Sequence, residues 1–380
     1  MLEYFKTAKA DIAVAVNKYM EEYGQVYHTV SAELGLDAAR RLAEFTGRGK
    51  MIRGCLVRLG YELASGRSAS GPDLEAVTMA GAAMELFQSG LLVHDDIMDR
   101  DRLRRGAPTL HVTYENSLLE AGALEPPHHG VALGICAGDL AYFAAFQLLA
   151  EMPVQDPAAR QACLIAAREL ALVGVAQMQD VTNGAKRPDT GGANISATKS
   201  AQWIGPAEAI SEDDVLRLYR YKTGRYTFSL PLALGAAIAG AAEPIRAALE
   251  AAGEHFGILF QLKDDELGLF ADEADLGKPI GADVKEDKKT LFRLRLFRQA
   301  GAPDLDRLRT LFGGGSPSPE QLLYIRGLVE KLGIRSELTA MMREQANLAE
   351  QRIAELLQAA PSAAAAAWRE LAAYSLERNS

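Results

Sequence analysis

The 380-residue chain has few of the residues from which many functional sites are built: three cysteines, six histidines and two tryptophans, with only 7% of its residues aromatic. Cys55, Cys136 and Cys163 lie far apart in apolar surroundings. That spacing predicts reduced, buried thiols in a cytoplasmic protein and argues against a disulfide framework or a zinc site. His128 and His129 are adjacent, but the sequence offers no third ligand near them, so a solvent-facing pair is the simpler interpretation.

Excess positive charge and long apolar runs are lacking too. The net charge of −9 argues against a nucleic-acid partner, because such proteins usually carry a basic face. The longest uncharged run, YTFSLPLALGAAIAGAA at 226–242, contains a proline and is shorter than the roughly 20 apolar residues of a membrane span. The start of the chain has no basic region followed by an apolar core. We therefore expect neither a signal peptide nor a membrane span.

Strand signals are scarce, since no clear hairpin turn separates two alternating apolar runs. Apolar residues recur instead at helical spacing, as in LEAVTMAGAAMELFQSGLLVHDDIMD and GDLAYFAAFQLLAEM, so the sequence predicts an all-α fold. Ser211 and Asp214 are expected to form a capping box, and Pro319 is expected to begin a helix. The predicted loops are 121–130, 183–210 and 312–321. We expect one domain over 1–380, with a C-terminal helical subdomain at 317–380.

Three aspartates end an apolar helical pattern in LVHDDIMDRDRLRRG. Asp95 and Asp99 are four residues apart and share a helix face, with Asp96 beside them. Clustered carboxylates repel one another and resist burial unless they share cations. Oxygen ligands suit Mg²⁺, which keeps several waters and bridges to phosphates, and Arg104 and Arg105 then suit diphosphate oxygens. The alternative is an ordinary amphipathic helix that ends in a solvated charge run.

The segment FQLKDDELGLFADEADLGKPIGADVKEDKKT at 260–290 has the same chemistry, because Asp264 and Asp265 also follow an apolar helical pattern. Basic side chains for further anion pockets are spread over several segments. They are Lys50, Arg53, Lys222, Lys278, Lys288 and Lys289, with Thr223 beside Lys222. Two acidic clusters and several basic ones thus predict two metal-binding walls and more than one anion pocket.

Five separated motifs carry a resemblance to a known family: GKMIR, DDIMD…RRG, AQMQD, KT and FQLKDD…GK…DVKEDKKT. In this order they resemble the trans-isoprenyl diphosphate synthases, the polyprenyl synthetase family, over roughly residues 40–300. The resemblance implies a single large bundle of helices around a deep central cavity, with the two aspartate motifs facing each other across its mouth. It also implies Mg²⁺-dependent, head-to-tail condensation of isopentenyl diphosphate with an allylic diphosphate, and a homodimer.

The resemblance assigns roles to individual residues. Three Mg²⁺ ions are expected at Asp95, Asp96, Asp99, Asp264 and Asp265, and these aspartates with Lys222 are the expected catalytic residues. The residues expected to hold the allylic diphosphate are Arg104, Lys222, Thr223, Gln261, Lys278 and Lys288. Those expected to hold isopentenyl diphosphate are Lys50, Arg53, Gln88 and Arg105. The chain departs from the family pattern at Ala176, which replaces a glycine before Gln177 and Asp180, and at Gly268, where a third aspartate is common.

Product length is expected to depend on the helix that precedes Asp95, where bulky residues form a floor in this family. Gly90 and Leu91 are not aromatic, so the floor is open, and Phe87 one turn deeper could block the cavity next. This predicts geranylgeranyl diphosphate (C20), with longer polyprenyl or farnesyl diphosphate as alternatives. A terpene cyclase of the same fold and a non-catalytic partner subunit are the rival functions. The retained isopentenyl pocket argues against the first, and the intact first aspartate motif against the second.

Overall fold

The computed structural model describes residues 3–185, 210–271 and 280–378. The protein divides into two compact units, each made of three separate stretches of chain. Unit 1 comprises Met1–Ala167, Leu230–Leu249 and Ala354–Glu370, and unit 2 comprises Arg168–Ser229, Glu250–Ile353 and Leu371–Ser380. The single domain over 1–380 and the subdomain at 317–380 stay predictions.

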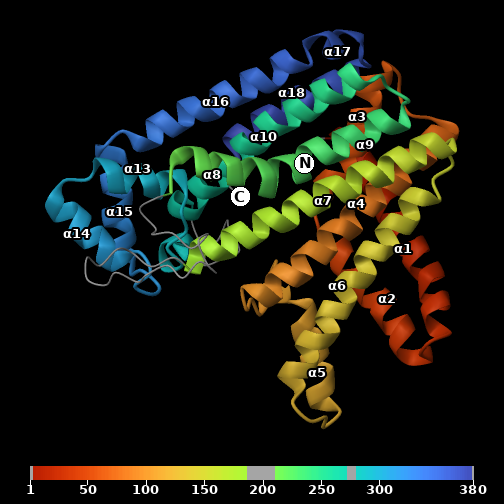
Figure 1. The fold of residues 1–380 in the computed structure, drawn as a ribbon, viewed down its shortest axis with the longest axis horizontal. Coiled ribbons are helices and arrows are strands. Elements are labelled where there is room, and N and C mark those ends of the chain that lie inside the picture. The colour runs from red at the N-terminus through yellow and green to blue at the C-terminus, as the bar shows by residue number, and fades with distance from the viewer. Residues whose placement is uncertain (1–2, 186–209, 272–279, 379–380) are drawn as a thin grey trace, which may run out of the picture. The chain divides into compact units, whose positions relative to one another are not determined.

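Nearly all of the described chain is helical, which confirms the predicted all-α fold (Figure 1). Unit 1 contains α1 (Glu3–His28), α2 (Ala32–Gly47), α3 (Ile52–Ser65), α4 (Gly71–Met98), β1 (Leu103–Arg104), β2 (Ala107–Pro108), α5 (Leu110–Glu120), α6 (Pro126–Ala150), α9 (Leu230–Ile238) and α17 (Ala354–Ala359). Unit 2 contains α8 (Glu212–Leu218), the π-helix η3 (Tyr219–Ser229), α12 (Ala282–Lys285), α13 (Leu291–Gln299), α14 (Ala302–Leu311), α15 (Pro319–Lys331) and α16 (Ile334–Arg352). Three helices contribute residues to both units: α7 (Asp156–Ala185), α10 (Glu243–Phe270) and α18 (Ser362–Glu377).

The core of unit 1 is built around α4, which packs on both α3 and α6. Helix α3 also crosses α9, and small residues allow this crossing: a Cβ placed on Gly60 would lie 2.5 Å from the carbonyl oxygen of Leu232. Large side chains such as Tyr61, Phe87 and Trp368 are fully buried. This packing fixes α4, the helix that ends in the first aspartates, along most of its length.

Unit 2 has its own apolar core, formed by side chains of α8, α10 and α13–α16 such as Leu259, Phe292 and Ile325. Its helix starts follow the sequence. Ser211 and Asp214 form the predicted capping box, and Pro319 is the first residue of α15. These caps satisfy backbone groups at helix ends that carry no intrahelical partner.

Three local expectations were wrong. Residues 103–108 form a two-stranded hairpin, in which Arg105 (φ 54°) and Gly106 (φ 74°) make the turn. Helix α6 begins at Pro126, inside the loop expected at 121–130, although His128 and His129 are exposed as expected. Of the three thiols only that of Cys55 is buried; Cys136 is exposed and Cys163 is partly buried. Most of the 183–210 loop lies outside the described residues.

Three helices are long and apolar enough, by length and composition alone, to cross a membrane: α4, α6 and most of α7. The apolar window of α4 is 78% buried in the structure, as expected of a core helix, whereas those of α6 and α7 are 39% and 33% buried. The expected absence of a membrane span stays a prediction. The apolar windows of α6 and α7 are therefore mostly not buried, unlike that of α4.

Candidate diphosphate and metal site

In unit 1 the first aspartates lie at the C-terminal end of α4. Asp95 and Asp96 are in its last turn, and Asp99 caps the helix, its N–H donating to the carbonyl oxygen of Asp95 at 2.8 Å. Arg104 Nε donates to Asp96 Oδ1, and Arg104 Nη2 lies 3.7 Å from carboxylate oxygens of Asp95 and Asp101. The arginine predicted to hold a diphosphate therefore also offsets the charge of the acidic cluster.

Asp96 is fully buried, and its Oδ2 atom has no hydrogen-bond partner. Burial raises the pKa of the Asp96 carboxyl to about 6, despite the opposing effect of Arg104. A buried carboxylate oxygen without a partner is unfavourable unless a ligand completes it. Asp96 therefore has one oxygen available for a cation.

The hairpin β1–β2 holds Arg104 and Arg105 on neighbouring positions with different surroundings. Arg105 Nη1 lies 3.1 Å from where a Cβ on Gly49 would be, so the Arg105 guanidinium reaches the start of the GKMIR motif. At the start of α3 the amide of Gly54 donates to Glu85 Oε1 at 2.8 Å. Burial raises the pKa of Glu85, and the charges of Arg53 and Arg105 oppose that shift. Glu85, which sequence analysis missed, thus links two of the predicted isopentenyl diphosphate residues.

The other two residues of that predicted set are also in unit 1. Gln88 is the one position between Met79 and Gly90 that is not buried, and Lys50 is exposed just before α3. The structure therefore presents the expected isopentenyl diphosphate residues from α3, α4 and the hairpin of a single unit. Their assignment to that substrate stays a prediction.

The chain-length residues lie on α4 as expected, but Gly90 does not open onto empty space. A Cβ on Gly90 would lie 2.8 Å from the ring of Tyr142 and 2.9 Å from the carbonyl oxygen of Gly138, both on α6. Phe87 is fully buried and packs edge-on against Phe146, with ring centroids 4.9 Å apart. Glycine at position 90 is thus explained by helix packing, and half-buried Leu91 is the better candidate for contact with a growing chain.

In unit 2 a chain of hydrogen bonds holds Asp265, whose side chain is buried near the end of α10. Gln261 Nε2 donates to Asp265 Oδ1 at 2.9 Å, and Thr223 Oγ1 donates to Gln261 Oε1 at 2.8 Å. The Tyr219 hydroxyl donates to Asp265 and accepts the amide of Leu291 at 3.1 Å. Burial raises the pKa of both Asp265 and Tyr219. Thr223 and Gln261, predicted from separate motifs, are therefore brought together, and Tyr219 is an addition.

The Lys222 ammonium donates to the carboxylate of Asp180, which joins the KT motif on η3 to the AQMQD motif on α7.

The Asp264 side chain is also held in place. Arg378 Nη2 donates to the Asp264 carboxylate and, at 3.1 Å, to the carbonyl oxygen of Phe260. Arg378 directly follows α18, and sequence analysis assigned it no role. The structure shows it docked on the second aspartate pair.

Gly268 occupies the position at which a third aspartate is common in the family, and the carboxylate of another residue lies close to it. Asp283 Oδ2 lies 3.0 Å from where a Cβ on Gly268 would be, and its charge raises the pKa of Asp265. Lys288 is exposed, and its ammonium lies 3.6 Å from carboxylate oxygens of both Asp283 and Glu286. Lys278 lies outside the described residues.

Comparison with known proteins places this geometry in a family. The polyprenyl synthetase family model matches residues 39–328. The chain belongs to this family. A geranylgeranyl diphosphate synthase of Sulfolobus acidocaldarius is 30% identical over 337 residues, which cover 88% of this chain and 87% of that protein. A second enzyme of that name, from Saccharolobus solfataricus, is 29% identical over 76% of this chain and 74% of its own length.

Among solved structures, this polyprenyl synthetase is similar to a geranylgeranyl pyrophosphate synthase of Corynebacterium glutamicum, determined in complex with isoprenyl diphosphate and magnesium. The TM-score is 0.79 at 28% identity, and the match covers 97% of this chain and 98% of the other. The resemblance drawn from five short motifs is thereby confirmed, and with it the prediction of a prenyltransferase of helical fold.

Carboxylates in each unit of this polyprenyl synthetase fit magnesium ligation that is completed by substrate. Within residues 3–185, 210–271 and 280–378, no group of three or more His, Cys, Asp or Glu side chains could hold an ion by itself. Mg²⁺ typically binds through one or two carboxylates together with waters and substrate phosphates, so such a cage is not required. Oxygen ligands of the required kind are present in each unit by itself: the unpartnered oxygen of Asp96 in unit 1, and the carboxylates of Asp264 and Asp265 in unit 2.

Proposed function

We propose that this polyprenyl synthetase condenses isopentenyl diphosphate with an allylic diphosphate, head to tail, to make geranylgeranyl diphosphate and release diphosphate. The observation that carries the proposal is the presence of two kinds of anion site. In unit 1 Arg104 pairs with Asp95 and Asp96. In unit 2 Thr223 bonds to Gln261 and Gln261 to Asp265, with Lys222 next to Thr223 in the chain. Each group suits a metal-bound diphosphate, and Lys50, Arg53, Gln88 and Arg105 form a further, largely basic set in unit 1. Two diphosphate substrates need two such sites.

The residues of the chain bind and orient the diphosphate substrates and neutralise their charge. Arg104 and Lys222 are already charge-paired with Asp96 and Asp180, so a diphosphate can exchange with carboxylates for these cations. Mg²⁺, when bound, offsets charge on the departing diphosphate, and we propose three ions held by the five aspartates. Departure leaves an allylic cation, which the double bond of isopentenyl diphosphate attacks. The proton lost afterwards passes to the released diphosphate, so the chain needs no general base.

The C20 product is supported by the absence of an aromatic residue at position 91. Leu91 is half-buried on α4 and Phe87 lies one turn deeper, packed against Phe146. Longer polyprenyl chains or farnesyl diphosphate are the alternatives. Because Gly90 contacts α6, Gly90→Phe would disturb helix packing and would not be a clean test of product length.

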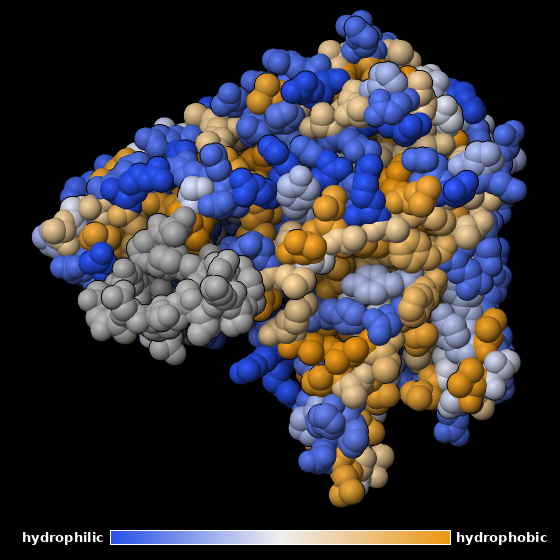
Figure 2. Space-filling view, in the orientation of Figure 1, coloured by the Kyte–Doolittle hydropathy of each residue, from blue (hydrophilic) through white to orange (hydrophobic). Residues whose placement is uncertain are grey.

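We also propose a homodimer that covers apolar surface on α6 and α7. Ile135, Phe143 and Leu164 are exposed there, and Phe143 is 70% exposed. Figure 2 shows apolar side chains gathered over α6 and the first half of α7. Large exposed apolar patches mark interaction sites. The same helices of a second copy of this chain, related by a two-fold axis, are the simplest partner to cover this patch. A cytoplasmic location stays a prediction.

The test of the proposed activity is release of diphosphate by the purified protein with Mg²⁺. Geranyl or farnesyl diphosphate is supplied alone and then together with isopentenyl diphosphate. We expect release only when both substrates are present, and none after EDTA is added. Release from the allylic diphosphate alone would indicate a terpene cyclase. No release with either starter would favour the non-catalytic subunit.

A further inference from the structure

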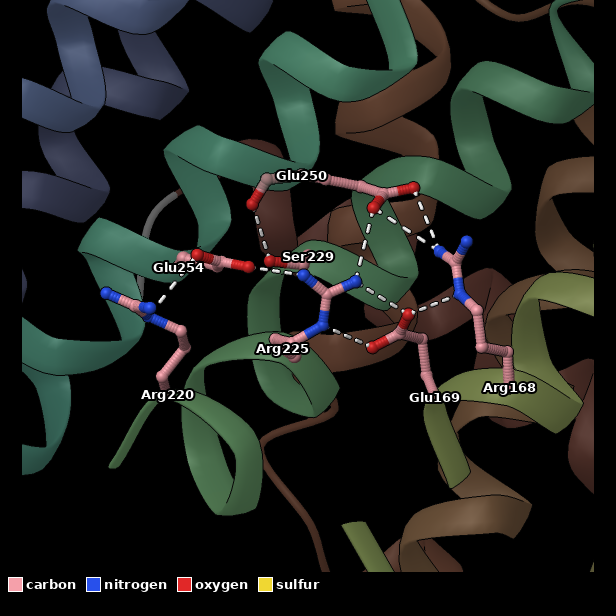
Figure 3. Close-up of polar contacts among 7 residues, drawn as sticks. All are labelled: Arg168, Glu169, Arg220, Arg225, Ser229, Glu250 and Glu254. Atoms are coloured by element: carbon pink, nitrogen blue, oxygen red, sulfur yellow. Dashed lines mark hydrogen bonds and ion pairs between the residues drawn. The ribbon is translucent and has the colours of Figure 1, made fainter. Parts of the chain in front are cut away.

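Three arginines and three glutamates join α7, η3 and α10 in unit 2 (Figure 3). Arg225, on η3, is at the centre of this cluster. Its Nε and Nη2 atoms each lie 2.7 Å from a carboxylate oxygen of Glu169 on α7, a two-pronged pair. On the α10 side Arg225 Nη1 donates to Glu254, and Nη2 lies 3.2 Å from Glu250 Oε2. One side chain thus ties η3 to the helices on both sides of it.

The other two arginines of the cluster, Arg168 and Arg220, balance the remaining negative charge of the glutamates. Arg168 Nε lies 2.9 Å from Glu169 and its Nη2 atom 3.3 Å from Glu250, while Arg220 Nε lies 3.4 Å from Glu254. Three positive charges therefore face three negative ones. The inner pair is the best shielded, because the Arg225 side chain is 14% exposed and that of Glu169 is 1% exposed. Removing Arg225 would leave the buried Glu169 carboxylate with only the more exposed Arg168.

The segment that Arg225 holds has an unusual backbone. Residues Tyr219–Ser229 form a π-helix, a geometry that is rare and usually limited to a single turn. It lies against α10 almost backbone to backbone: a Cβ on Gly253 would be 2.5 Å from the amide nitrogen of Ser229, and Ser229 Oγ donates to the carbonyl oxygen of Glu250 at 2.6 Å. The π-helix is a rare alternative to the α-helix, so tertiary contacts are needed to keep this segment in the π-helical form.

Arg225 follows Thr223 by two residues and Lys222 by three. Thr223 and Lys222 are the two residues of η3 proposed to bind the allylic diphosphate. A change in the path of η3 at Arg225 would move both, together with the Thr223–Gln261–Asp265 hydrogen bonds. We propose that Arg225, through Glu169 and Glu254, is the positioning residue that holds η3 in its π-helical form and so aligns Lys222 and Thr223 for the allylic diphosphate. This inference rests on the proposed function. Arg225 touches no proposed ligand itself.

The test compares Arg225→Gln with Arg168→Gln. Both variants remove one positive charge from the same cluster, because Arg168 contacts Glu169 and Glu250, two of the three partners of Arg225. Arg168, however, is on α7 and is not part of η3. In Arg225→Gln we expect KM for the allylic diphosphate to rise about tenfold or more, since small misplacement of binding groups is costly, with KM for isopentenyl diphosphate unchanged. Arg225→Lys should recover only part of the loss, because an ammonium cannot make the two-pronged pair with Glu169. Arg168→Gln should leave both KM values unchanged.

A readout independent of activity separates this inference from the proposed function. Amide hydrogen exchange over 219–229 should become faster in Arg225→Gln and remain unchanged in Arg168→Gln, and calorimetry should show weaker binding of inorganic diphosphate with Mg²⁺ in Arg225→Gln. If the wild-type protein condenses no substrates yet these two changes occur, the proposed function fails and the positioning role stands. If exchange over 219–229 and the ratio of the two KM values match wild type in folded Arg225→Gln, the positioning role is wrong.

Discussion

Arg378, near the end of the chain, holds Asp264 of the second aspartate pair and stacks on Phe260. Its Nη2 atom donates to the Asp264 carboxylate, and its guanidinium carbon lies 3.9 Å from the centre of the Phe260 ring. The Asp264 side chain is 42% exposed, so this pair is only partly shielded from water. An oxygen that a metal is proposed to bind is therefore already occupied by an internal cation.

Removing this internal cation should strengthen magnesium binding. In Arg378→Gln we expect the Mg²⁺ concentration for half-saturation to fall by up to about fivefold, the effect of losing a partly exposed ion pair. The measurement is calorimetric titration of Mg²⁺ in the presence of inorganic diphosphate. Arg369→Gln, on the helix α18 that Arg378 directly follows, is the control. An unchanged or higher half-saturation concentration in Arg378→Gln would show that Arg378 does not compete with the metal.

Asp283 is expected to contribute to the second aspartate site that Gly268 leaves one carboxylate short. Asp283→Asn should raise the Mg²⁺ concentration for half-maximal activity several-fold, by about threefold to tenfold for loss of one charge-assisted contact. Glu286→Gln is the matched control, since Glu286 also lies 3.6 Å from Lys288 but its side chain is 51% exposed. If both variants raise the Mg²⁺ concentration for half-maximal activity equally, Asp283 acts only through its contact with Lys288 and not at the metal site.

Glu85 should affect one substrate only. Glu85→Gln removes the charge that faces Arg53 and Arg105 while keeping an acceptor for the amide of Gly54. We expect KM for isopentenyl diphosphate to change by about fivefold or more and KM for the allylic diphosphate to stay constant. Glu62→Gln, another buried glutamate, which accepts hydrogen bonds from Tyr4 and Arg58, is the control. A change in both KM values would contradict a role confined to the isopentenyl pocket.

Leu91 is the position at which product length should respond. Leu91→Phe should shift the main product from C20 to C15, because a ring adds bulk one turn above Phe87 on the helix face that the two residues share. Leu92→Phe, one residue further along and on another face of the helix, should leave the product unchanged. Chromatography of the dephosphorylated products measures both. An unchanged distribution in Leu91→Phe would mean that other residues set the length.

The sequence predicted the helical fold and most of the site because both depend on local patterns. Helical spacing, capping residues and five short motifs are visible without tertiary structure. The hairpin at 103–108 was missed because its Arg-Gly turn lacks the usual Asn-Gly or Asp-Gly signal. Tyr219 and Arg378 were not assigned because they meet Asp265 and Asp264 across 46 and 114 residues, and only folding reveals such contacts.

The most direct test of the account is the chain length of the product that the purified protein makes from farnesyl diphosphate, isopentenyl diphosphate and Mg²⁺. We predict a dominant C20 product that disappears when EDTA is added and in Asp96→Asn. A C20 product that persists in both cases would contradict the metal site. Absence of any elongated product from farnesyl, geranyl or dimethylallyl diphosphate would contradict the proposed condensation.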